Sequence, residues 1–293
     1  MEYQKKFRHC YIRVYNGNQW FRFSLFPSML VVVSLLIIGG CGTTKKITDK
    51  YNRGDGLDLY LLIGQSNMAG RASMASVQDT LKNVYIFDGL SWQPAANPLN
   101  KYSTVRKPIG MQKLGPGYAF ARKLQKCTGR AIGLVVNARG GTKIEWWQKG
   151  YVGPHDDSLY EKAVIEMRKA LPYGHLKGII WHQGEGNQHN PEDYMALLKT
   201  LVKDLRMDLD AKDVYFVAGE LGKWRSSSIR MNQVISSISS TIKQSGYVST
   251  DGLTPLKGDS TNPHFDARSQ LILGDRYADQ VLKRVYGRRP CKQ

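Results

Sequence analysis

From residue 57 onward, the sequence alternates short apolar runs with segments whose apolar residues recur at helical spacing, and this alternation constrains the fold most. The apolar runs, which we interpret as buried strands, lie at 57–63, 84–87, 131–136, 176–181 and 214–218. The helical patterns lie at 118–126, 159–171, 191–205, 228–244 and 266–286. This order predicts an α/β domain with a parallel sheet, helices on both faces and right-handed crossovers.

The predicted domain spans residues 57–286, because no internal repeat and no linker interrupts this stretch. Within it, residues 92–112 show no clear periodicity, and we expect them to form a long surface loop near the functional site. A short basic tail, 287–293, follows the domain. Of the 293 residues, 42% are hydrophobic, which is enough for one large core.

An apolar segment at 29–40 precedes the domain and ends in Gly39, Gly40 and Cys41. A membrane-spanning helix needs roughly 20 apolar residues, so this segment is too short to span. Basic residues before it and small residues after it are typical of a secretory signal. The ending Ile-Gly-Gly-Cys resembles a bacterial lipobox, in which the cysteine is lipidated; an ordinary signal peptide or a short anchor is the alternative.

We therefore expect residues 1–41 to be a lipoprotein signal peptide and residues 42–56 to be a polar tether. Lipidation of Cys41 would attach the domain to a membrane of the bacterial cell envelope, where it would face the periplasm or the cell surface. The membrane is then one expected partner, through the lipid anchor.

The chain carries a net charge of +18, which favours anionic partners such as acidic glycans or anionic lipid. Because no zinc-finger spacing, RNP-like motif or basic-aromatic tract occurs, we expect no nucleic-acid partner. Of the cysteines outside the leader, Cys127 and Cys291 could pair or stay free. We favour free thiols, since one lies in a helical pattern and the other in the basic tail.

Polar, glycine-containing blocks follow three of the predicted strands, at 64–70, 137–142 and 182–187, and a fourth block at 259–266 precedes the last helix. The carboxyl ends of parallel strands meet at one edge of the sheet, where ligands bind. Together the blocks contain a serine, histidines, carboxylates and glycines, which acyl transfer requires as nucleophile, base, orienting acid and oxyanion hole.

The motifs Gly-Gln-Ser-Asn-Met at 64–68, Gly-Gly-Thr at 140–142, His-Gln-Gly-Glu at 182–185 and His-Phe-Asp at 264–266 stand in this order. They resemble the ordered blocks of SGNH-type hydrolases, above all the sialate O-acetylesterase and acetylxylan esterase group. The resemblance covers residues 57–286. It implies a three-layer α/β/α sandwich with a flavodoxin-like parallel sheet. The Gly-x-Ser-x-Gly elbow of α/β-hydrolases is not met, because Met68 stands where its second glycine belongs.

The resemblance implies a serine esterase that hydrolyses O-acetyl esters on carbohydrates, of the sialic acid or the xylan type. Ser66 is then the nucleophile and His264 the base, whereas His182 shapes the site. Outside this context Ser66 would be interpreted as a helix N-cap. The +18 charge weakly favours an anionic glycan. The alternative is a catalytically impaired, glycan-binding surface lipoprotein on the same fold.

The acid partner of His264 departs from the family pattern. Many relatives carry aspartate three residues before the histidine, but that position here is Thr261, which cannot ionise. Glu185 and Asp259 are the two carboxylates that could substitute. We favour Glu185, because its His-Gln-Gly-Glu block is intact.

For the oxyanion hole, the resemblance nominates the Ser66 amide, the amide of Gly140 or Gly141, and the Gln183 side chain. The choice between the two glycines stays open. Four further side chains could line a sugar site, although burial in the core is equally compatible with the tryptophans; they are Arg139, Trp146, Trp147 and Trp224.

Neither a metal nor a cofactor is expected. His182 and His189 lie seven residues apart, and no cysteine cluster accompanies them. No Gly-x-Gly-x-x-Gly or P-loop pattern follows a predicted strand.

Overall fold

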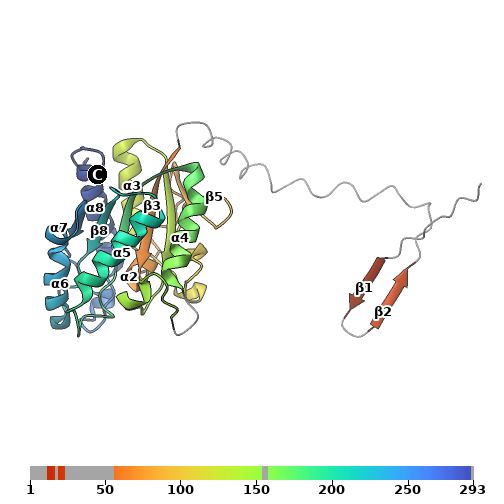
Figure 1. Ribbon diagram of the computed structural model, residues 1–293, viewed down its shortest axis with the longest axis horizontal. Coiled ribbons are helices and arrows are strands. Elements are labelled where there is room, and N and C mark those ends of the chain that lie inside the picture. Colours follow the sequence, from red (N-terminus) through yellow and green to blue (C-terminus); the bar gives the residue numbers. More distant parts are fainter. Residues whose placement is uncertain (1–11, 17–18, 24–55, 154–157, 292–293) are drawn as a thin grey trace, which may run out of the picture. The chain divides into compact units, whose positions relative to one another are not determined.

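The computed structural model describes residues 12–16, 19–23, 56–153 and 158–291, in two separate units. In the first unit, β1 (Ile12–Asn16) pairs with β2 (Gln19–Phe23) in antiparallel fashion (Figure 1). Cys41, the apolar segment 29–40 and the expected tether up to residue 55 lie outside the described residues. None of the helices described is both long and apolar enough to cross a membrane.

The second unit is built on a seven-stranded sheet within the described residues. Its strands are β3 (Leu57–Gly64), β4 (Val84–Phe87), β5 (Trp92–Pro94), β6 (Ile132–Ala138), β7 (Gly174–His182), β8 (Tyr215–Gly219) and β9 (Ser245–Val248). The spatial order is β5-β4-β6-β3-β7-β8-β9, and every neighbouring pair is parallel except β4 with β5.

Five of these strands, in the order β6-β3-β7-β8-β9, have the 2-1-3-4-5 arrangement of a flavodoxin-like sheet. The β4–β5 hairpin extends this sheet beyond β6. The chain leaves β3 toward β6 on one side and reaches β7 on the other, so the topological switch point lies beside β3, where ligands are expected to bind.

Helices cover both faces of the sheet (Figure 1). The α-helices of this unit are α2 (Ser66–Ala69), α3 (Gly117–Thr128), α4 (Leu159–Ala170), α5 (Tyr194–Asp208), α6 (Ile229–Ser236), α7 (Ile238–Thr241) and α8 (Ala267–Arg284). Short 3-10 helices are η1 (Leu99–Tyr102), η2 (Ile109–Met111), η3 (Ile144–Trp147), η4 (Leu171–Tyr173), η5 (Ser226–Ser228) and η6 (Leu256–Gly258).

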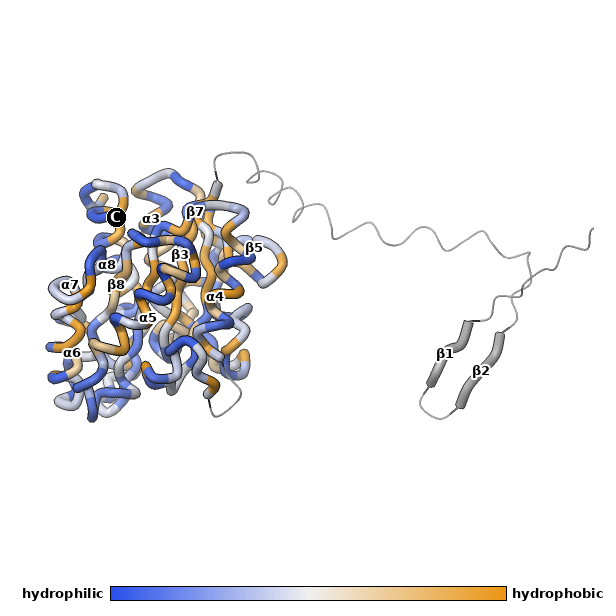
Figure 2. Tube along the Cα trace, viewed as in Figure 1, coloured by the Kyte–Doolittle hydropathy of each residue, from blue (hydrophilic) through white to orange (hydrophobic). Residues whose placement is uncertain are grey.

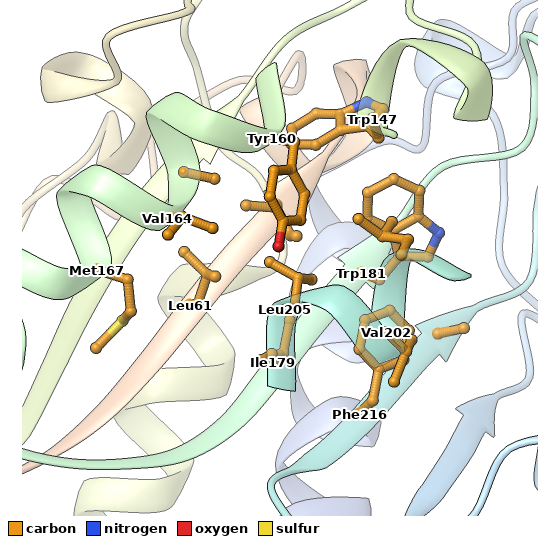
Figure 3. Packing of buried hydrophobic residues seen from close by; sticks show 14 of the residues in the cluster. Leu61, Trp147, Tyr160, Val164, Met167, Ile179, Trp181, Val202, Leu205 and Phe216 are labelled. Atoms are coloured by element: carbon orange, nitrogen blue, oxygen red, sulfur yellow. The ribbon is translucent and has the colours of Figure 1, made fainter. Parts of the chain in front are cut away.

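The central strand β3 shows how the sequence specifies these layers. All of its residues are buried, because each face of the strand is covered by helices. Leu59 and Leu61 belong to the core on the side of α4 and α5 (Figure 3), whereas Tyr60 and Leu62 belong to the core on the side of α3 and α8. The apolar colour in Figure 2 accordingly follows the strands. The expected three-layer α/β/α sandwich is confirmed.

Three local expectations differ from the structure. The helix expected at 228–244 breaks at Ser237 into α6 and α7. The strand β9 follows, and the sequence did not predict it because the run Ser-Gly-Tyr-Val is too short and polar to be recognised as a strand. The stretch 92–112 is not a simple surface loop. It contains β5, η1 and η2, and it buries Trp92 and Asn100.

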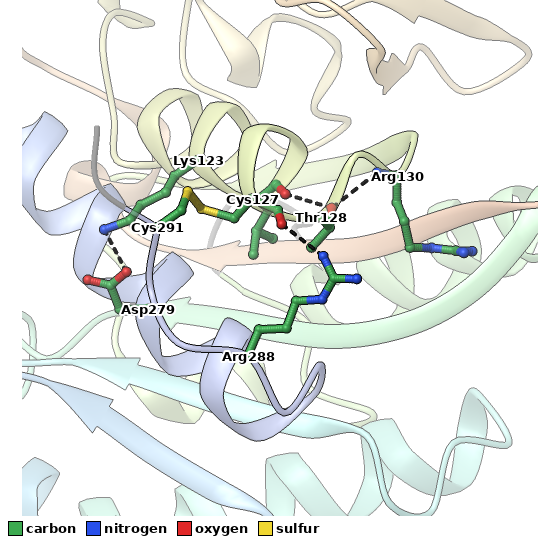
Figure 4. The surroundings of a disulfide bond; sticks show 8 residues. Lys123, Cys127, Thr128, Arg130, Asp279, Arg288 and Cys291 are labelled. Atoms are coloured by element: carbon green, nitrogen blue, oxygen red, sulfur yellow. Dashed lines mark hydrogen bonds and ion pairs between the residues drawn. A yellow bond between two sulfur atoms is a disulfide. The ribbon is translucent and has the colours of Figure 1, made fainter.

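The expectation of free thiols is wrong: Cys127 and Cys291 form a disulfide, with their Cα atoms 5.6 Å apart (Figure 4). Cys127 lies in the last turn of α3, which packs beside α8, and the segment after α8 returns to that turn. Arg288 donates a hydrogen bond to the Cys127 carbonyl oxygen at 2.9 Å, which holds the returning segment in place.

Candidate active site

Ser66 lies at the carboxyl end of the central strand, as the first residue of α2. Just before it, Gly64 has a φ of +134°, and a Cβ there would overlap the His182 carbonyl oxygen of the neighbouring β7. Glycine is therefore required for the strand to turn into α2 at this point. The Gln65 side-chain oxygen accepts weak hydrogen bonds from the amides of Gly184 and Gly186, which ties the first block to the third.

His264 meets Ser66 across the site: the distance between His264 Nε2 and Ser66 Oγ is 2.9 Å. His264 lies in the loop before α8, whose N-cap Asp266 accepts a hydrogen bond from the Ser269 amide. The Leu256 amide donates to the His264 carbonyl oxygen at 2.7 Å and fixes this loop from the other side. The arrangement is the one that a base needs to take the proton of a serine hydroxyl.

The imidazole of His264 is half-buried, and its pKa is lowered to about 4, mainly by burial and in addition by the positive charges of Arg71 and Arg225. The ring is therefore neutral at pH 7 and able to accept a proton. An imidazolium formed during a reaction would need compensation by a negative charge nearby.

Glu185 follows β7 and faces the same cavity, but its carboxylate is directed at Asn67. The distance from Asn67 Nδ2 to Glu185 Oε1 is 2.6 Å, while Oε2 is buried without a hydrogen-bond partner among the described residues. Burial raises the pKa of Glu185 to about 7, against the lowering effects of a backbone hydrogen bond, the Asn67 amide and the charge of Arg225.

Asp259 is exposed and lies in its own turn. Its carboxylate accepts hydrogen bonds from the backbone amide and the hydroxyl of Thr261, at 2.9 and 2.7 Å. Thr261, at the position where many relatives carry aspartate, is thus engaged by Asp259. Among the residues described, neither Glu185 nor Asp259 forms a hydrogen bond with His264, and the choice of acid stays a prediction.

The glycine block lies beside the serine. A Cβ added to Gly140 would be 3.3 Å from the Ser66 Cβ, and it would overlap the guanidinium of Arg71. Gly141, with φ of +79°, is exposed and has open space around it. Gly140 is therefore the glycine packed against the nucleophile, and the Ser66 amide opens α2, where a backbone N–H lacks an intrahelical acceptor.

Gln183 lies away from the position that we expected. Its side chain is fully buried, and Nε2 donates to the Thr142 carbonyl oxygen and to Asn187 Oδ1, each at 3.0 Å. Both amide protons are thus used in hydrogen bonds that hold two loops together. The Gln183 side chain therefore has no free proton to donate to an oxyanion, which is the role we expected for it.

Ser66 and His264 line a cavity of about 510 Å³, together with Glu185, Gly140 and Gly141. The sequence interpretation missed its cationic wall, which consists of Arg71, Lys107, Lys143 and Arg225. Arg71 could have been suspected from its place five residues after the nucleophile, whereas no motif marks Arg225. A larger cavity, of about 710 Å³, lies at the amino ends of β7 and β8, away from the serine.

The candidate sugar-site residues have separate places. Trp146 lines the cavity, and Trp147 is buried in the core against Trp181. Trp224 packs against Phe265 behind the base, and its indole donates to the Asn262 carbonyl oxygen. Arg139 donates to the Val105 carbonyl oxygen and is not part of the cavity wall.

A buried histidine supports the site from behind. His182 is fully buried, and its Nδ1 lies 2.9 Å from the Tyr277 hydroxyl, which itself donates to the Trp181 carbonyl oxygen. Nδ1 is therefore the protonated nitrogen. Burial lowers the pKa of His182 to about 3, and its ring packs edge-on against Phe265, next to the base.

A flavodoxin-like α/β/α sandwich with a serine and a histidine at hydrogen-bond distance on the carboxyl edge of its sheet defines the class as SGNH-type hydrolases. Residues 56–283 match the model of the family described as carbohydrate esterase, sialic acid-specific acetylesterase. The chain therefore belongs to this family and is a carboxylic ester hydrolase.

Known proteins agree with this assignment. A probable carbohydrate esterase of Arabidopsis thaliana is 30% identical in an alignment 251 residues long, which covers 76% of this chain and 90% of that protein. The X-ray structure of a protein from Arabidopsis thaliana has a TM-score of 0.68 at 24% identity, covering 78% of this chain and 99% of that one. A carbohydrate acetylesterase from Xanthomonas citri shares the fold, with a TM-score of 0.60 at 20% identity over 78% of this chain and 56% of that one.

Proposed function

We propose that this protein removes acetyl groups from carbohydrates by a Ser-His-acid mechanism, with Ser66 as nucleophile, His264 as base and Glu185 as acid. The observation that carries the proposal is the 2.9 Å distance between Ser66 Oγ and His264 Nε2, both of which line a cavity of about 510 Å³. No cofactor or metal takes part in this mechanism.

In the first half-reaction Ser66 Oγ attacks the acetyl carbonyl carbon, and its proton moves to His264 Nε2. The amides of Ser66 and Gly140 stabilise the oxyanion that forms. His264 then returns the proton to the sugar oxygen, which leaves as an alcohol. In the second half-reaction a water molecule attacks the acetyl carbonyl carbon and gives a proton to His264 Nε2. The bond to Ser66 Oγ then breaks, acetate leaves, and His264 returns the proton to Ser66 Oγ.

The negative charge of Glu185 would stabilise the imidazolium in both half-reactions. This contribution acts through space in the free enzyme, because the carboxylate binds Asn67 and not the imidazole. Glu185 Oε2 is buried without a hydrogen-bond partner among the described residues, and we propose that it turns toward the ring when substrate binds.

For the substrate we propose an anionic acetylated sugar of the sialic acid type, ahead of neutral acetylated xylan. Four cationic side chains line the cavity. Glu185, the one carboxylate among the described residues that line it, has a pKa raised to about 7 and so carries only part of a negative charge at neutral pH. A sugar carboxylate would gain favourable electrostatic interactions there. Trp146 offers an aromatic face for the pyranose ring.

A para-nitrophenyl acetate assay on the domain tests the reaction. We expect hydrolysis by the wild type and a loss of about 10⁴-fold or more in Ser66→Ala. Equal rates for both proteins would refute the esterase mechanism and favour the alternative, a glycan-binding protein on the same fold. The position of Thr261, bound to Asp259 and not to the base, is the observation that favours this alternative.

Acetate release from matched acetylated glycans tests the substrate. O-acetylated sialic acid and acetylated xylooligosaccharides are compared at equal concentration, and we expect the sialic acid to have the higher kcat/KM. A preference for the neutral xylooligosaccharides would contradict the assignment from charge.

We also propose that the protein is a lipoprotein of the bacterial cell envelope, anchored through Cys41. The support is the sequence alone: the apolar segment 29–40 and the Gly-Gly-Cys ending. Radiolabelled palmitate should label the wild type and not Cys41→Ala. Label that survives in the variant, or its absence from the wild type, would contradict the anchor.

A further inference from the structure

The side chain of Asn67, the residue after the nucleophile, uses its whole hydrogen-bonding capacity. A primary amide has two N–H donors and an oxygen with two lone pairs. Asn67 Nδ2 donates to Glu185 Oε1 at 2.6 Å and to the Pro263 carbonyl oxygen at 3.0 Å. Asn67 Oδ1 accepts from the Phe265 amide and from Gln270 Nε2, each at 3.2 Å. The side chain is completely buried, so no bond to water can replace these four.

Two of the four bonds hold the backbone on either side of His264. Pro263 precedes the base and Phe265 follows it. A carbonyl can only accept and an amide N–H can only donate, so the oxygen and nitrogen of Asn67 cannot exchange places. The loop that carries the base is thus fixed, in one orientation, to the residue next to the nucleophile.

The hydrogen bond from Asn67 to Glu185 connects the base loop to the acid. Asn67 donates to Glu185, and a hydrogen bond to the charged form favours ionisation of the carboxyl group. Among the described residues, neither Glu185 nor Asp259 forms a hydrogen bond with the imidazole ring. Asn67 instead holds the histidine through its backbone.

We propose that Asn67 is a positioning residue, which sets His264 against Ser66 and holds the carboxylate of Glu185 beside them by a hydrogen bond. The role rests on the proposed esterase mechanism. Asn67 does not touch the reacting atoms; it acts through the two backbone groups that flank His264 and through the carboxylate of Glu185.

The charged and titratable groups around this pair belong to several elements. Arg225 acts on both Glu185 and His264, and Arg71 acts on His264. The buried phenols of Tyr194 and Tyr277 face Glu185 and have pKa values raised mainly by burial, so they stay neutral near pH 7. Of the described groups named here, the carboxyl of Glu185 and the imidazole of His264 are the two with pKa values between about 4 and about 7.

The test compares Asn67→Ala with Asn232→Ala. Asn232 is also buried and also holds a loop, through hydrogen bonds with the backbone amide and carbonyl of Leu221. Among the described residues it forms no side-chain hydrogen bond with the base loop. Both changes should lower Tm. Asn67→Ala should lower kcat about 100-fold with KM within about threefold, whereas Asn232→Ala should keep kcat within about threefold.

The pH profile separates positioning from general destabilisation. Loss of the Asn67 donor raises the pKa of Glu185, so activity should require a higher pH, and the acid limb of kcat should move up by about one unit or more. Asn67→Asp has nearly the shape of asparagine and places a second carboxyl group beside Glu185. This variant should also move the acid limb of kcat to higher pH. It serves as the test of the positioning role if Asn67→Ala does not fold.

The outcomes are separable. A wild type without Ser66-dependent hydrolysis would overturn both the proposed function and this role. Ser66-dependent hydrolysis that keeps its kcat and its acid limb in the Asn67 variants would overturn the role of Asn67 alone. Equal losses of kcat in Asn67→Ala and Asn232→Ala would likewise reduce Asn67 to a structural residue.

Discussion

The two sides of the His264 imidazole differ in how completely they are built. On the side of Nε2, the nucleophile lies 2.9 Å away and Gly140 packs against it. On the opposite side, neither candidate carboxylate in the described residues hydrogen-bonds the ring; Glu185 binds Asn67 and Asp259 binds Thr261. The serine side is thus ready to react, whereas the acid side acts at a distance.

This difference shows that a nucleophile–base pair can be set by backbone geometry without a carboxylate on the ring. Asn67 holds the base loop through Pro263 and Phe265. The acid is then not needed to orient the imidazole, and its remaining role is to stabilise the imidazolium electrostatically. Variants on the two sides should therefore have different kinetic signatures.

Among variants that keep both Ser66 and His264, the largest expected effect is on the acid side. Glu185→Gln keeps an oxygen for Asn67 but removes the charge, and we expect kcat/KM to fall about 100-fold. Asp259→Asn should stay within about threefold, because this carboxylate is exposed and binds only its own turn. The measurement is kcat/KM with para-nitrophenyl acetate.

The reverse result, a small loss in Glu185→Gln and a large one in Asp259→Asn, would make Asp259 the acid. It would also show that the loop 259–264 rearranges when substrate binds, because Asp259 does not reach the ring in the free enzyme.

The serine side can be tested with its two glycines. Gly140→Ala places a Cβ against Ser66 and Arg71, and we expect kcat to fall about 30-fold as the oxyanion donor moves. Gly141→Ala has open space but a positive φ, so it should lower Tm while leaving kcat within about threefold. If kcat falls more in Gly141→Ala, the oxyanion donor is Gly141.

The pH profile measures how the two sides are coupled. His264 must be neutral and Glu185 ionised, and their pKa values are about 4 and about 7. Both requirements are met at high pH, so kcat/KM should rise with pH up to about 7 and fall about tenfold per unit below it. In Glu185→Gln the plateau of kcat/KM should be lower than in the wild type, and it should extend down toward pH 5. A wild-type limb near pH 4 would mean that Glu185 is not needed in ionised form.

The sequence specified the central sheet well, because strands buried on both faces need unbroken apolar runs, as in 57–63 and 131–136. It did not reveal β9, whose residues become a strand only through pairing with β8. The disulfide was equally hidden, because it depends on the return of the segment after α8 to α3.

Within the site, the blocks predicted which residues gather but not how their side chains pair. As the blocks predicted, Ser66, His264 and Glu185 lie together and line one cavity. The motifs could not show that Asn67 donates a hydrogen bond to the Glu185 carboxylate, or that Gln183 donates both amide protons to groups in neighbouring loops. Such pairings follow from side-chain rotamers and burial, which motifs do not encode.

The smallest expected effect concerns the cationic wall, which lines the same cavity as the imidazole. Arg225→Met removes a charge that lowers the pKa of His264 and that would attract an anionic sugar. For an O-acetylated sialic acid we expect kcat/KM to fall about fivefold, with most of the loss at low salt, because exposed charge interactions are weak and screened. An acetylated xylooligosaccharide serves as the neutral control and should lose less than about twofold, and Arg225→Lys should retain the preference. Equal losses for the two substrates would mean that Arg225 acts on the base and not on the sugar, which would leave the wall without a role in substrate choice.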